Sequence, residues 1–440
     1  MKERTTGENK TVDGRNIIRT FILFLLMMST VGCGADTLSD FLFPPPSPPP
    51  TIEAPPTLTP TPGTVVMSAA SPTPVPFPPR PEDLADYPTA IIAYLNDSQG
   101  DVDGLRKGLE GWDALRHVAD LLRADVDDDG KGELLLIIVD PSSEYGINLA
   151  GDVLVIDIEG QEYSLAHRAT RDLLILDPSL LKVDDVNRDG YTELAFTSTS
   201  CGAHTCVTTV YILASGTGMY RDLTNGGIEM SFAEVSFSDW DGDDVPELVI
   251  YGGIIGSAGA GPQRDRTEVY RWDGLTYTLV ETVWDPSNYL YFKVMDANQA
   301  LLEGKYERAV TLYEQAIENP SLQIWMEESE REELTAFARY RLSLAYLLLG
   351  DIADAKLARD GLLTEQPDNI YAQVVTVLWD TYLVGADLTA ACEAVGTFAA
   401  AHPATANVLA DYGYGNPTFT PEEVCPTTLF QTPIARRQDA

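Results

Sequence analysis

The sequence predicts a multidomain protein in which an all-β region of three similar units is followed by an all-α region of helical repeats. Between about residues 120 and 290, three acidic segments recur, and a short apolar stretch follows each one at once. After residue 291, apolar and small residues recur at helical spacing instead. With 440 residues, 44% of them hydrophobic, the chain is long enough for several domains with a real core.

Residues 1–32 predict a cleaved export signal, in which Arg15 and Arg19 precede the apolar run 21–28. This run is too short to span a bilayer, because a spanning helix needs about 20 apolar residues. The ending 30–33, Thr-Val-Gly-Cys, resembles the bacterial lipoprotein box. The resemblance implies that Cys33 is lipidated and anchors an extracytoplasmic protein to the bacterial membrane or cell surface. Plain secretion is the alternative.

Two further segments precede the β region. Residues 33–81 form a linker, with 16 prolines between Pro44 and Pro81, and such a composition predicts an extended, semi-rigid spacer. Residues 82–119 predict a helical pair, because apolar residues recur there at helical spacing.

The charge of the chain excludes one class of partner. Its 67 acidic and 29 basic side chains give a formal net charge of -38. Such a chain repels phosphate backbones and offers no basic stripe, so nucleic-acid binding is not expected.

The β region, residues 120–290, is predicted to be propeller-like, with three recognisable blades. Each unit begins with an acidic loop: loop 1 is Asp125 to Glu133, loop 2 is Asp185 to Glu193, and loop 3 is Asp239 to Glu247. An apolar strand and a hairpin follow, and the second arm of the hairpin carries a tyrosine 38, 35 or 38 residues after the first Asp. The loops are 60 and 54 residues apart, which suits one small antiparallel sheet per unit.

The three loops offer oxygen ligands at alternate positions, as calcium requires. The candidate ligands occupy places one, three, five, seven (through the main-chain carbonyl) and nine of each loop: Asp125, Asp127, Asp129, Lys131 and Glu133; Asp185, Asn187, Asp189, Tyr191 and Glu193; Asp239, Asp241, Asp243, Val245 and Glu247. Place six is Gly130 or Gly190 in the first two loops. In loop 3 it is Asp244, so this turn must form with a side chain present.

This pattern is not that of an EF-hand, whose loop has a twelfth-place Glu and flanking helices. The twelfth places here are apolar and lie in the predicted strands. The pattern instead resembles the FG-GAP or VCBS-type repeats of integrin alpha-chain propellers and bacterial surface proteins. The resemblance covers about 170 residues and implies calcium as a structural cofactor.

Residues 291–410 predict helical hairpins. Small and aromatic residues from Ala297 to Pro320 and from Leu342 to Pro367 resemble the tetratricopeptide repeat, and a third unit near Gly385 to Pro403 departs from the pattern at Asp387. Residues 411–440 are expected to form a C-terminal tail.

Four cysteines remain besides Cys33, and an oxidising compartment favours disulfides. The close spacing of Cys201 and Cys206 favours their pairing, which leaves Cys392 and Cys425 to join the tail to a helix. A metal site at Cys201, His204 and Cys206 is the alternative, although closed zinc sites need four ligands.

The sequence predicts no enzyme. It has no Gly-x-Ser-x-Gly elbow, and the glycine-rich stretch 252–261, expected to be a mobile surface loop, lacks the ending of a phosphate loop. The predicted function is a non-catalytic, calcium-stabilised lipoprotein that binds a protein or glycan. The alternative is an accessory or sensor subunit of an extracytoplasmic hydrolase, or the hydrolase itself.

Overall fold

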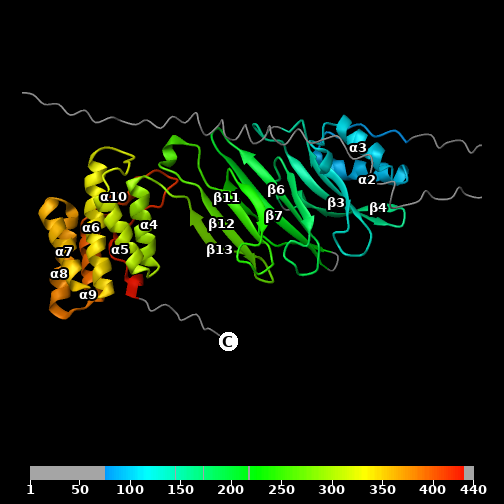
Figure 1. The fold of residues 1–440 in the computed structure, drawn as a ribbon. Coiled ribbons are helices and arrows are strands. Elements are labelled where there is room, and N and C mark those ends of the chain that lie inside the picture. The colour runs from blue at the N-terminus through cyan, green and yellow to red at the C-terminus, as the bar shows by residue number, and fades with distance from the viewer. Residues whose placement is uncertain (1–74, 144, 172, 217–218, 431–440) are drawn as a thin grey trace, which may run out of the picture. The chain divides into compact units, whose positions relative to one another are not determined.

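The computed structural model describes residues 75–143, 145–171, 173–216 and 219–430 (Figure 1). A β region precedes an α region, so the coarse fold class predicted from the sequence is confirmed. The predicted signal 1–32, Cys33, most of the linker 33–81 and the end of the tail lie outside the described residues. No helix within the described ranges is both long enough and apolar enough to cross a membrane.

The β region consists of three antiparallel sheets, each a meander of successive strands. Sheet 1 contains β1 (Leu121–Ala124), β2 (Glu133–Val139), β3 (Gly151–Glu159) and β4 (Glu162–Arg168). Sheet 2 contains β5 (Ser179–Asp184), β6 (Glu193–Cys201), β7 (Cys206–Gly216), β8 (Met219–Asp222) and β9 (Ile228–Ser231), which pairs with β7. Sheet 3 contains β10 (Glu234–Ser238), β11 (Glu247–Gly252), β12 (Arg266–Trp272) and β13 (Tyr277–Trp284). Each acidic loop joins the first two strands of its sheet.

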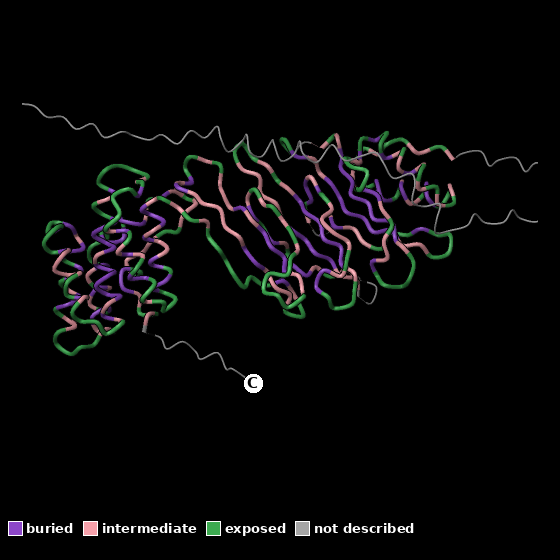
Figure 2. The backbone as a smooth tube through the Cα atoms, in the orientation of Figure 1, coloured by how far each residue is buried: buried purple, intermediate pink, exposed green. Residues whose placement is uncertain are grey.

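Strand β2 is apolar on both faces after Glu133, because it packs against a neighbour on each side. Every residue of β2 is buried (Figure 2). Leu134 and Leu136 pack with helices α2 (Tyr87–Asp97) and α3 (Val102–Gly111), whereas Leu135 packs with residues of sheet 2. Sheet 2 in turn shares a cluster with sheet 3. The order of packing is therefore helices, sheet 1, sheet 2, sheet 3, and this two-sided packing explains why β2 is a continuous apolar run instead of alternating.

The α region has one continuous core. Its helices are α4 (Leu290–Leu302), α5 (Tyr306–Glu318), α6 (Ser329–Leu349), α7 (Ile352–Glu365), α8 (Ile370–Gly385), α9 (Leu388–Ala401) and α10 (Ala404–Ala410). Gly350 ends α6 in the left-handed conformation with φ 79°, which glycine adopts without strain. Asp387, the departure from the repeat pattern, caps α9: its carboxylate accepts from the amides of Thr389 and Ala390.

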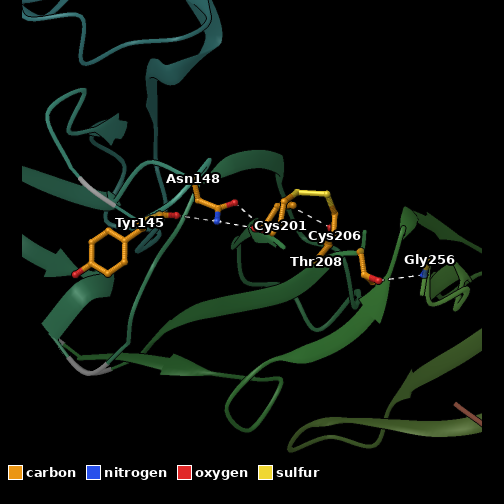
Figure 3. The surroundings of a disulfide bond; sticks show 8 residues. Tyr145, Asn148, Cys201, Cys206, Thr208 and Gly256 are labelled. Atoms are coloured by element: carbon orange, nitrogen blue, oxygen red, sulfur yellow. Dashed lines mark hydrogen bonds between the residues drawn. A yellow bond between two sulfur atoms is a disulfide. The ribbon is translucent and has the colours of Figure 1, made fainter. Parts of the chain in front are cut away.

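Both predicted disulfides are confirmed. Cys392 of α9 is joined to Cys425, and Cys201 is joined to Cys206 across the β6–β7 hairpin. Figure 3 shows the second bond, beside which the Asn148 side chain accepts from the Cys201 amide and donates to its carbonyl, at 2.7 and 3.0 Å. The alternative metal site at Cys201, His204 and Cys206 is therefore wrong, because the disulfide uses both thiols.

The glycine-rich stretch 252–261 leads from β11 to β12, and Gly256, Ala258 and Gly259 are exposed there, whereas its end is held in place. Ala260 is fully buried, and the side-chain amide of Asn416 donates to its carbonyl at 3.0 Å. A Cβ on Gly261 would lie 1.6 Å from the carbonyl oxygen of Tyr412. Glycine at position 261 therefore allows the backbone of this stretch to approach the backbone at Tyr412 closely.

Candidate metal centres in the acidic loops

The three loops share one backbone shape. Places four and six adopt positive φ in each: 59° and 85° at Asp128 and Gly130, 56° and 93° at Arg188 and Gly190, and 83° and 71° at Gly242 and Asp244. Loop 3 thus moves its glycine from place six to place four and leaves an aspartate at place six. Asp tolerates this region better than most residues, so the turn forms with the side chain present.

The same four hydrogen bonds hold each loop. The amide of place six donates to the first Asp, the amide of place five to the side chain of place three, the amide of place seven to the side chain of place five, and the amide of place two to the final Glu. The lengths are 2.8–3.2 Å in loop 1, 2.9–3.1 Å in loop 2 and 2.8–3.3 Å in loop 3. The side-chain oxygens are therefore positioned by the backbone before any ligand binds.

In loop 1, single oxygens of Asp125, Asp127 and Glu133 lie within 4.8 Å of one another. Glu133 is 1% exposed, and its Oε1 has no hydrogen-bond partner among the described residues. Burial raises the pKa of Glu133, and neighbouring Asp127 raises it further. Asp129 does not join this group, because it accepts from the Lys131 amine at 2.6 Å, which lowers its pKa. Three acidic groups thus face one another, and no basic side chain of the described residues pairs with them.

Loop 2 has the same hydrogen-bonded turn, with an amide, Asn187, at place three. Glu193 is fully buried, and its Oε1 also finds no partner within the described part of the chain. Burial raises the pKa of Glu193 to about 7, with Asp189 and Asp185 adding to the shift. A buried carboxylate oxygen without a partner is unfavourable unless a proton or a cation satisfies it.

In loop 3, oxygens of Asp239, Asp241 and Glu247 again converge within 4.8 Å. Here the group has a countercharge from its own sheet. The Arg271 guanidinium of β12 donates through Nε to Glu247 Oε1 at 3.2 Å and through Nη2 to Asp241. The two carboxylates raise the pKa of Arg271.

Two tyrosines from the following sheet lie beside the first two centres. Burial raises the pKa of Tyr220 in β8, and the next causes are Glu133 and Asp127 of loop 1. Burial likewise raises the pKa of Tyr277 in β13, followed by Glu193 of loop 2. Each of these two centres is thus covered by the sheet that comes next in the chain.

The structure brings together three of the five predicted ligand residues in loop 1 and three of the five in loop 3. It adds Asp157 and Arg271, which the sequence reasoning missed. Asp157 of β3 is close enough to loop 1 to raise the pKa of Asp127. The strand register could have indicated both residues. Asp157 lies on β3, which pairs with β2 after loop 1, and Arg271 lies on β12, which pairs with β11 after loop 3.

Comparison of the chain with protein-family models, with curated proteins and with solved structures found no match to any of them.

Proposed function

We propose that this chain is a non-catalytic binding protein stabilised by calcium, held outside the cytoplasm by a lipid on Cys33, with a protein or glycan as its partner. The observation that carries the calcium part is the pair of buried, unpartnered carboxylate oxygens, Glu133 Oε1 and Glu193 Oε1, in two loops of the same shape. The repeated oxygen ligands and the resemblance of the loops to FG-GAP or VCBS repeats support it.

The ligand atoms favour calcium over other cations. Loop 1 offers carboxylates alone, and loop 2 adds one amide oxygen, whereas zinc prefers nitrogen and sulfur. Magnesium demands a nearly ideal octahedron of six ligands, but calcium accepts six to eight oxygens in irregular geometry. Acidic loops of nine residues, with oxygens at alternate places, suit the second requirement.

The proposed role of calcium is structural. Loop 1 touches loop 2, because the Thr192 amide donates to Asp128 at 3.2 Å. Neutralising the carboxylates would therefore stabilise both loops and the packing of the sheets between them. We interpret the sheets as propeller-type blades, since each is an antiparallel meander with its acidic loop in the first hairpin. The binding surface is assigned to the helical repeats, whose relatives in other proteins bind partners in a groove.

Thermal unfolding of the full chain tests the calcium part. Calcium should raise the melting temperature relative to chelator. At a calcium concentration one hundred times the dissociation constant, the free energy of unfolding should rise by about 2.7 kcal/mol per site. Magnesium at equal concentration is the control and should give a smaller shift. A melting curve indifferent to calcium and chelator would contradict the proposal.

The binding part needs a separate experiment. The full chain is immobilised and exposed to membrane extract in calcium and in chelator, and bound proteins and glycans are identified. A partner recovered reproducibly in calcium and reduced in chelator is expected. Recovery of none in either condition would count against a binding role.

A further inference from the structure

We infer that only loops 1 and 2 bind a cation, and that in loop 3 the Arg271 guanidinium takes the place of the metal. The inference rests on the proposed calcium function and specifies which centres carry it. It departs from the expectation that Asp239, Asp241, Asp243, Val245 and Glu247 form a third calcium site.

The argument begins with the strand register. In sheet 2, Glu193 pairs with Ala214 of β7. In the other two sheets, Leu134 pairs with Ile156 and Leu248 pairs with Tyr270. Extending each by one residue places Asp157 opposite Glu133 and Arg271 opposite Glu247. The same position therefore carries an acid in sheet 1, a methyl group in sheet 2 and a guanidinium in sheet 3.

This single position decides the charge of each centre. Asp157 adds a negative charge to the candidate metal centre of loop 1 (centre 1). Ala214 adds no charge to the candidate metal centre of loop 2 (centre 2). Arg271 reaches Asp241 and Glu247, two of the three carboxylates that converge in loop 3. Its Nε satisfies Glu247 Oε1, the atom that corresponds to the unpartnered Oε1 of Glu133 and Glu193. A divalent cation there would have to displace the guanidinium and overcome its repulsion.

Lys131 in loop 1 does not act in the same way. Its amine pairs with the carboxylate of Asp129, and within the described part of the chain the buried Glu133 oxygen still has no partner. An exposed lysine of this kind is flexible and its ion pair is weak, so it does not replace a cation in the centre.

The position of sheet 3 explains why its loop differs. The place-two side chains of loops 1 and 2, Val126 and Val186, are 1% exposed and pack against the following sheet. The corresponding Trp240 of loop 3 is 45% exposed, and its Nε1 donates to Glu281 of its own sheet. No later sheet exists among the described residues, so centre 3 lacks a tyrosine such as Tyr220 or Tyr277. Its countercharge comes instead from its own sheet.

Equilibrium dialysis of the full chain with calcium at physiological salt counts the bound ions. The wild-type chain should bind two. Arg271→Ala, which copies the alanine of sheet 2, should bind three, and Ala214→Arg, which copies the arginine of sheet 3, should bind one. Arg271→Lys retains a positive charge and should remain at two. The Arg271 side chain is 42% exposed, so its replacement is compatible with folding, which circular dichroism checks.

Tryptophan fluorescence locates the added ion. Calcium should change the emission of Arg271→Ala more than that of the wild type, and adding Trp240→Phe should abolish the difference. Three ions bound by the wild type, or two bound by Arg271→Ala, would overturn the inference while leaving the proposed function intact. Binding of no ion by the wild type would instead refute the proposed function.

Discussion

Loop 3 differs from loops 1 and 2 most clearly in the side chain that lies opposite its final Glu. All three share the left-handed places four and six, the same four hydrogen bonds and a final Glu that is at most 1% exposed. Only in loop 3 does an arginine reach that Glu from the neighbouring strand. The comparison teaches that the loop sequence sets the positions of the oxygens, while the residue opposite the final Glu sets whether those oxygens are free for a cation.

The largest expected effect comes from replacing the final Glu in each loop. Glu133→Gln or Glu193→Gln should each remove one site and about 2.7 kcal/mol of the stabilisation measured at a hundredfold excess of calcium. In chelator the same variants should be about 1 kcal/mol more stable than the wild type, because glutamine removes a buried, unpartnered charge. Calorimetric melting in the two conditions measures both changes.

Glu247→Gln is the matched control for this pair. It should leave the calcium response unchanged and lower the stability in chelator by about 0.5–1 kcal/mol, because it breaks a half-exposed pair with Arg271. If all three variants behaved alike, the distinction between the loops would be wrong.

A smaller effect is expected from pH. The pKa of Glu193 rises from its ordinary value of 4.5 to about 7 in the folded chain. Between these values the folded chain binds more protons than the unfolded chain, so its stability falls as the pH rises. This contribution is complete below pH 4.5 and is lost as the pH passes through about 7.

The melting temperature of the wild type in chelator should therefore fall as the pH rises across that range. The melting temperature of Glu193→Gln should fall less. The calcium-induced gain should rise over the same range, since the cation needs the ionised carboxylate. An equal fall in Glu193→Gln and in the wild type would show that other groups cause the pH dependence.

Local sequence patterns predicted those parts of the fold that depend on contacts between residues close together in the chain. The oxygens of loop 1 are held by hydrogen bonds that span at most seven residues, so spacing alone indicated the turn. Cys201 and Cys206 are likewise near in sequence and face each other across one hairpin.

Local sequence patterns could not predict contacts between segments that are distant in the chain. Arg271 lies 24 residues after Glu247, and only the pairing of β11 with β12 brings them together. The carbonyls of Ala260 and Pro262 accept from the side-chain amide of Asn416, which lies more than 150 residues further along the chain. Asp387 looked like a broken repeat because its role as a helix cap depends on where α9 begins.

The smallest expected effect concerns centre 1 alone. Asp157→Ala removes the extra carboxylate and makes the position opposite Glu133 identical to Ala214 in sheet 2. One charge close to a bound cation contributes on the order of 1.4 kcal/mol in a partly solvated site, which corresponds to a tenfold weaker affinity. Calcium titration of Asp157→Ala in the Glu193→Gln background isolates centre 1 and measures this change. An affinity unchanged by Asp157→Ala would show that the position opposite the final Glu acts only when it carries a positive charge, as in sheet 3.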